Sequence, residues 1–198
     1  MLFRSRHDLA RVTFLVLDTV NEHGGWEGSL DPVQLDWLDT ELAMADAERR
    51  YVVLVSHHPL DTLVNPLGED RLLGGAVQQL LDGHPSVILW LAGHDHAVSA
   101  TPRRSYWEVV APSLIDWPQQ GRIVELSRGG GLIRIAATMI DHAGSAPWDG
   151  TIDSIEGLAG LSRELAGNHW QARRYDEQPR AGRADERNVL LYLPDPFA

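Results

Sequence analysis

Three of the nine histidines in this chain follow directly on apolar segments, where an imidazole is well placed to bind a metal ion. His57 follows the segment 51–55, and His94 and His96, one residue apart, follow a second such segment. Neutral imidazole is a common ligand for transition-metal ions. If residues 93–96 are extended, His94 and His96 point the same way; if they turn, the two side chains diverge toward two neighbouring metals. The pattern predicts a metal site and leaves open whether it holds one ion or two.

The remaining histidines are expected to have ordinary roles. Four lie in polar loops or at the ends of elements, where surface or capping roles are usual: His7, His23, His84 and His169. His142 follows an apolar segment, but a structural role is favoured for it as well. Replacing His94 or His96 should therefore reduce bound metal, whereas replacing His84 or His169 should not.

Two strand–helix–strand units are expected to position the three candidate ligands. Buried strands and amphipathic helices alternate at residues 11–17, 32–47, 51–55, 73–81 and 87–91. Asp31 and Pro32 are residue types preferred just before and at the first position of a helix. Ligands of open α/β sheets bind outside the carboxyl ends of the strands, so the two histidine-bearing ends should meet.

The pattern changes after residue 100. Three strand-like segments predict an antiparallel meander, with a hairpin turn at residues 129–131; they lie at residues 106–110, 122–126 and 132–139. Asp153 with Glu156 resembles a capping box that opens a helix. Four apolar residues are expected to form the buried face of this helix: Ile155, Leu158, Leu161 and Leu165. Residues 172–187 are expected to form a solvated loop, and residues 188–193 a short strand.

These elements predict one α/β domain over residues 1–198. Its expected parts are a strand–helix–strand region (1–100), a β meander (101–145) and a C-terminal helix and tail (146–198). The 198 residues are enough to bury a core of ordinary size.

The composition argues against several classes of protein. The formal net charge of −11 disfavours nonspecific binding to nucleic acid or anionic membranes. No apolar run approaches the roughly 18 residues that cross a bilayer. The chain has no lysine and no cysteine, so Schiff-base, P-loop and thiolate-metal chemistry are excluded. The N-terminal residues do not form a signal peptide. The compartment is therefore cytoplasmic by default, and exported if a signal lies upstream of Met1.

The two histidine segments resemble the last two sequence blocks of the calcineurin-like metallophosphoesterases. They read Val-Leu-Val-Ser-His-His-Pro at residues 53–59 and Leu-Ala-Gly-His-Asp-His at residues 91–96. The whole chain resembles the C-terminal part of a bacterial branch of that superfamily, with further support at residues 17–19, 116–120 and 193–197. The resemblance implies part of a four-layer α-β-β-α sandwich, with a mixed sheet and a C-terminal antiparallel meander.

The resemblance also implies ligands and a reaction. His57 and His94 would bind one metal and His96 the other, whereas His58 and Asp95 fill variable positions without a metal role. The complete family holds two divalent ions such as iron, manganese or zinc. It hydrolyses phosphate mono- or diesters by metal-activated water. No catalytic or substrate-binding residue is assigned here, although the loops at residues 24–28 and 116–118 are expected to border the site.

The chain departs from the family in lacking three earlier blocks, Asp-x-His, Gly-Asp and Gly-Asn-His, which supply the acidic ligands. We therefore expect the chain to begin inside a longer protein and to be catalytically incomplete alone. The alternative is a fragment that acts as a metal-binding or interaction module. The expected partners are a phosphate-ester small molecule, with neither nucleic acid nor membrane, and a second chain paired through an exposed sheet face.

Two other hydrolase classes fit poorly. A metallo-β-lactamase-like enzyme needs His-x-His-x-Asp-His, but His96 is followed by Ala97-Val98-Ser99. A Ser-His-Asp hydrolase of the α/β class needs a Gly-x-Ser-x-Gly elbow, which the sequence lacks.

Overall fold

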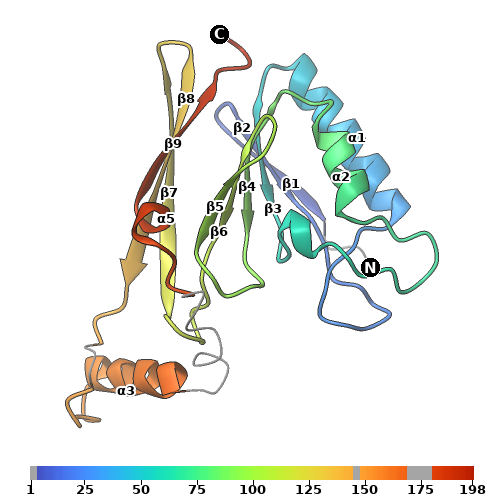
Figure 1. Cartoon of the computed structure of the whole chain (residues 1–198). Coiled ribbons are helices and arrows are strands. Elements are labelled where there is room, and N and C mark those ends of the chain that lie inside the picture. Colours follow the sequence, from blue (N-terminus) through green and yellow to red (C-terminus); the bar gives the residue numbers. More distant parts are fainter. Residues whose placement is uncertain (1–3, 145–147, 169–179) are drawn as a thin grey trace.

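The protein consists of two β-sheets and a set of helices, which a computed structural model describes for residues 4–144, 148–168 and 180–198 (Figure 1). A six-stranded sheet has the order β1-β2-β3-β4-β6-β5, and a three-stranded sheet the order β7-β8-β9. The strands are β1 (Ser5–Leu9), β2 (Val12–Val16), β3 (Tyr51–Val55), β4 (Val87–Ala92), β5 (Ser99–Pro102), β6 (Trp107–Val110), β7 (Gln120–Gly129), β8 (Leu132–Asp141) and β9 (Val189–Pro194). The helices are α1 (Pro32–Ala47), the 3-10 helix η1 (Leu60–Thr62), α2 (Gly74–Leu81), α3 (Ile155–Asn168) and α5 (Ala184–Arg187). No helix in these ranges has the length and apolarity needed to cross a membrane.

The centre of the large sheet is parallel, as the two strand–helix–strand units predicted. β2, β3, β4 and β6 run in one direction, and β1 and β5 pair antiparallel at the two edges. Val52, Val53 and Leu54 of β3 are all fully buried, because the sheet is covered on both faces. The carboxyl ends of β2, β3 and β4 consequently lie at the same edge of the sheet.

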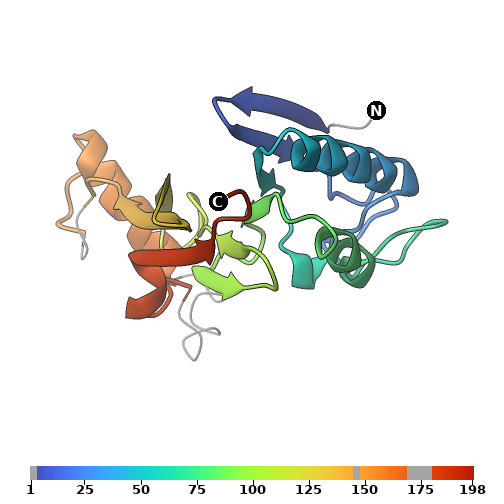
Figure 2. The ribbon, with the colours of Figure 1, turned by 90° about the horizontal axis from the view of Figure 1, so that it is seen from above.

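Helices α1 and α2 cover one face of the large sheet (Figures 1 and 2). The Asp31 side chain caps α1 by accepting a hydrogen bond of 2.9 Å from the Gln34 backbone N–H. Leu38 and Leu42 of this helix are fully buried against the sheet. The predicted start and end of α1 are therefore confirmed.

The other face of the large sheet packs on the three-stranded sheet (Figure 2). Val53 and Leu89 of the large sheet share one apolar core with Ile135 and Leu191 of the small one. The predicted hairpin turn joins β7 to β8 through Gly130–Gly131, with φ of 60° and 75°. Glycine adopts these left-handed values without steric cost, as a two-residue turn of this kind requires.

The fold class is confirmed as part of an α-β-β sandwich, with one correction to the strands. Residues 106–110 were expected in the antiparallel meander, but Trp107–Val110 forms β6, parallel to β4 in the large sheet. The physical reason is burial: Glu108, Val109 and Val110 are all buried, which suits a sheet covered on both faces rather than a half-exposed meander. The third strand of the small sheet is β9 instead.

The outer face of the small sheet is open among the described residues. Ile123, Leu190 and Tyr192 are about half exposed on it. Helix α3 lies at one end of the sheet and not across this face (Figure 1). An exposed sheet face therefore exists as expected, and its pairing with a second chain stays a prediction.

The predicted buried face of α3 is wrong. Ile155, Leu158 and Leu165 are exposed, whereas the buried residues are Gly157, Gly160 and Arg163. The helix contacts the neighbouring loops closely through glycines. A Cβ at Gly157 would lie 2.4 Å from the Thr151 carbonyl oxygen, and a Cβ at Gly144 would lie 2.4 Å from the Gly160 backbone nitrogen. The Ser154 hydroxyl, rather than Asp153, accepts from the Gly157 backbone N–H at 3.0 Å.

The packing between the sheets yields a stability test. Ile135→Ala removes a fully buried side chain from the core between the sheets. It should lower the free energy of unfolding by about 2–5 kcal/mol in urea denaturation. Ile123→Ala, on the open face, is the matched control and should change it by under about 1 kcal/mol. Equal losses would contradict the face-to-face arrangement of the two sheets.

Candidate metal centre

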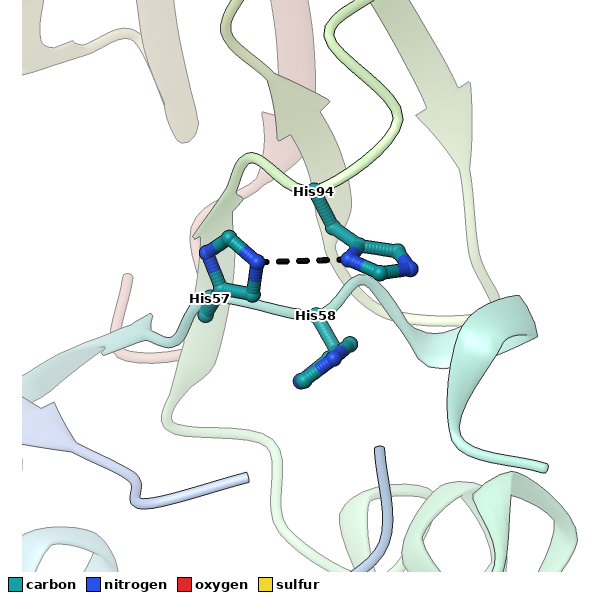
Figure 3. A group of neighbouring side chains, drawn as sticks. All are labelled: His57, His58 and His94. Carbon is teal, nitrogen blue, oxygen red and sulfur yellow. Dashed lines mark hydrogen bonds between the residues drawn. The ribbon is translucent and has the colours of Figure 1, made fainter. Parts of the chain in front are cut away.

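Three histidines gather where β3 and β4 end (Figure 3). His57, His58 and His94 each offer a ring nitrogen, and these nitrogens all lie within 4.8 Å of one another. Nε2 of His57 is 3.2 Å from Nδ1 of His94. The Gly93 backbone N–H donates to the His57 carbonyl at 3.0 Å, so the two strand ends are joined beyond the sheet. The expected meeting of the histidine-bearing ends is observed.

The segment 93–96 turns instead of staying extended. His94 and His96 have φ of 68° and 54°, and the Asp95 N–H donates to the Gly93 carbonyl at 2.9 Å. Residues other than glycine rarely adopt this left-handed backbone conformation. Such backbone strain is often found at functional sites. The turn sends the two imidazoles apart, which decides the alternative that the spacing left open.

His96 consequently lies outside the three-histidine group. Its Nδ1 is 2.7 Å from Oδ2 of Asp116, in the loop that follows β6. The same carboxylate oxygen is 3.5 Å from Nη1 of Arg180. The structure thus brings His57 and His94 together and places His96 beside them, facing a different loop.

His58 takes part in the group but has both ring nitrogens engaged. Its Nδ1 is 2.8 Å from the Thr19 hydroxyl, and its Nε2 is 2.9 Å from the Trp26 carbonyl. The side chain is 3% exposed, and a Cβ at Gly28 would come within 2.6 Å of its ring. A metal would have to displace one of these hydrogen bonds. The geometry therefore favours His58 as a support for the loop 19–28 over a role as ligand.

Glu27 provides a carboxylate beside the histidines. Its Oε1 accepts from the Trp26 indole N–H at 3.0 Å. Its Oε2 is buried, has no hydrogen-bond partner and lies 3.5 Å from Nε2 of His94. A buried carboxylate oxygen without a donor is costly unless a positive charge or a proton donor compensates it. This orphaned oxygen, next to imidazoles, fits a site for a divalent cation.

The electrostatics of the group favour neutral imidazoles, the form that binds metals. Loss of water around the ring lowers the pKa of His57, and repulsion from His58 and His96 lowers it further. Burial likewise lowers the pKa of His58. At neutral pH these rings therefore keep lone pairs for a hydrogen-bond donor or a metal.

His84 and His142 have side-chain partners away from the three-histidine group. His84 is held by Asp46 at 2.7 Å and Asp39 at 3.0 Å, next to α1. His142 interacts with Gln119 and with the Gly144 N–H. His169 lies outside the described residues. The loops at residues 24–28 and 116–118 do contact the site, through Trp26, Glu27 and Asp116. Sequence reasoning missed the individual contacts of Glu27 and Asp116.

Comparisons with known proteins indicate the class of protein that the chain resembles. No protein-family model matches the chain. The manganese-dependent ADP-ribose/CDP-alcohol diphosphatase of Xenopus laevis is 35% identical over 75 residues, which are 36% of this chain and 20% of that protein. A probable cyclic nucleotide phosphodiesterase of Synechococcus is 28% identical over 138 residues, 59% of this chain and 51% of that protein. The chain thus spans from about a fifth to about half of the length of these curated relatives.

A solved structure gives the class of fold. A dimetal phosphatase from Danio rerio matches with a TM-score of 0.53 at 19% identity, covering 70% of this chain and 57% of that one. The chain therefore has a dimetal-phosphatase fold. Together with the sequence matches, this confirms the resemblance to the calcineurin-like metallophosphoesterases.

The different roles of His57 and His58 can be separated by mutation. His58→Ala should lower the free energy of unfolding of the metal-free protein by about 1–3 kcal/mol, because the Thr19 hydroxyl and the Trp26 carbonyl lose their partner. His57→Ala is the matched control, because its ring is exposed and should contribute little to stability. Thermal or urea unfolding without metal measures both. If His57→Ala destabilises the metal-free protein as strongly, the supporting role of His58 is wrong.

Proposed function

We propose that this chain carries the histidine half of a metallophosphoesterase that hydrolyses a phosphate mono- or diester. The observation behind the proposal is the joining of the β3 and β4 ends, which brings Nε2 of His57 and Nδ1 of His94 to 3.2 Å from each other. His57, His94 and His96 are the proposed metal ligands. The fold of the dimetal phosphatases and the sequence similarity to two phosphoric-ester hydrolases support it.

The chain's own residues would hold the metal and set its surroundings. Divalent cations, when bound, would supply charge for the phosphoryl oxygens and lower the pKa of a water. His57 and His94 would hold one cation through neutral nitrogens, and His96 would hold a second. Three neutral ligands leave a divalent charge uncompensated, and the carboxylates of Glu27 and Asp116 lie where they can offset it. Manganese is the first ion to test, because the diphosphatase relative is named as manganese-dependent.

The proposed substrate class is a small phosphodiester or diphosphate, in keeping with the names of the relatives. The net charge of −11 disfavours a polyanionic partner such as nucleic acid. A small substrate would reach the site at the exposed His57 from the sheet edge where β3 and β4 end.

Metal content and turnover test the proposal on one sample. The purified chain, loaded with Mn²⁺, should retain metal in plasma mass spectrometry. Cleavage of bis(p-nitrophenyl) phosphate should need both the metal and the acidic ligands of the three blocks that the sequence lacks. His94→Ala and His96→Ala should each lose bound metal. His84→Ala is the control and should keep it, since His84 is held by Asp46 and Asp39.

Two results would contradict the proposal. Equal metal content in His94→Ala and His84→Ala would refute the ligand assignment. Bound metal without any turnover, even in a longer protein that also carries the Asp-x-His, Gly-Asp and Gly-Asn-His blocks, would refute the enzymatic part and favour a metal-binding or interaction module.

A further inference from the structure

The two imidazoles that diverge at residues 93–96 each face a carboxylate from a separate loop. Nε2 of His94 lies 3.5 Å from Glu27, and Nδ1 of His96 lies 2.7 Å from Asp116. We propose that Glu27 and Asp116 are positioning residues that fix the two histidines in opposite tautomers. A metal would then meet Nδ1 of His94 and Nε2 of His96. This inference rests on the proposed metal centre and assigns which ring nitrogens serve it.

The tautomer of His96 follows from the chemistry of its partner. An ionised carboxylate can only accept hydrogen bonds, so at 2.7 Å Nδ1 of a neutral His96 must carry the proton that Asp116 accepts. Nε2 then keeps its lone pair and is the nitrogen left for a metal. Ligating histidines commonly donate their other N–H to a carboxylate, which fixes both tautomer and ring orientation.

The opposite tautomer is favoured at His94. Its Nδ1 is hydrogen-bonded to Nε2 of His57 at 3.2 Å, and with the His94 proton on Nε2 this Nδ1 is the acceptor and Nε2–H of His57 the donor. A proton on Nε2 of His94 points toward the Glu27 carboxylate, whose buried Oε2 otherwise has no donor. A proton on Nε2 of His94 therefore lies on the side of this carboxylate oxygen, 3.5 Å away, and leaves Nδ1 without a proton for the metal shared with His57.

The backbone of each of these two acidic residues is held in place by its own loop. The Asp116 backbone N–H donates to the Ser113 hydroxyl at 3.0 Å, and its carbonyl accepts from the Gln119 N–H at 2.8 Å. The Glu27 carbonyl accepts from the Asn65 amide at 3.1 Å. Groups that are ordered before the ligand arrives lose less entropy when it binds. These contacts suit side chains that orient ligands.

The chain contains a matched control pair away from the site. Nδ1 of His84 lies 2.7 Å from Oδ2 of Asp46, the same atoms and distance as in the pair of His96 and Asp116. Asp46→Asn therefore disturbs an equivalent histidine–carboxylate contact without touching the proposed ligands.

Nitrogen-15 NMR of the ring nitrogens in the metal-free protein reads the tautomers directly. At about pH 8, His96 should carry its proton on Nδ1 and His94 on Nε2. Asp116→Asn should move His96 toward a mixture of tautomers, and Glu27→Gln should do so for His94. Asp46→Asn should affect only His84.

Isothermal titration with Mn²⁺ or Zn²⁺ provides the second readout. Asp116→Asn and Glu27→Gln should each weaken binding about 10–100-fold, whereas Asp46→Asn should leave the affinity unchanged. The inference is overturned if His94 and His96 share one tautomer in the unsubstituted chain, or if the two variants bind metal as tightly as it does. Failure of the unsubstituted chain to bind either ion would instead refute the metal centre itself, and the positioning role with it.

Discussion

The site depends on one continuation of the sheet hydrogen bonding past the ends of β3 and β4. The Ser56 N–H donates to the Leu91 carbonyl at 3.1 Å, and the Gly93 N–H donates to the His57 carbonyl at 3.0 Å. These bonds carry the parallel register two residues beyond the strands and fix the backbones that bear His57 and His94. Because both faces of the sheet are covered, by helices and by the second sheet, this register cannot slip without exposing a core.

The loops add what the strand ends lack, namely carboxylates. These supply negative charge and influence which ring nitrogen of each histidine carries the proton. The loop after β2 reaches the histidines through Thr19, Trp26 and Glu27, and the loop after β6 reaches them through Asp116. Strand ends in a parallel sheet are evenly spaced and point their side chains in fixed directions. Loops of different length can therefore change the number and position of the carboxylates without moving the imidazoles. One fold can support different activities in this way.

Local signals predicted the parts of the structure that depend on sequence neighbours. Asp31, Pro32 and the leucine spacing were enough to define α1, and the two apolar segments before the histidines were enough to predict that their ends meet. The edge strands β1 and β5 were missed because they are short, polar and only partly buried, so no periodic pattern marks them. The face of α3 was predicted wrongly because its glycines, not its leucines, meet the neighbouring loops.

The sequence could not show which ring nitrogen of each histidine faces a metal, because this too depends on contacts between distant residues. His94 and Glu27 are far apart in the chain, and only tertiary contact decides which nitrogen faces the carboxylate. The left-handed turn at residues 93–96 then makes neighbours in sequence face different loops. If the turn were extended, both imidazoles would share one carboxylate environment and one tautomer. The backbone strain at two non-glycine residues is thus the feature that separates one imidazole position from the other, as the proposed site for two ions requires.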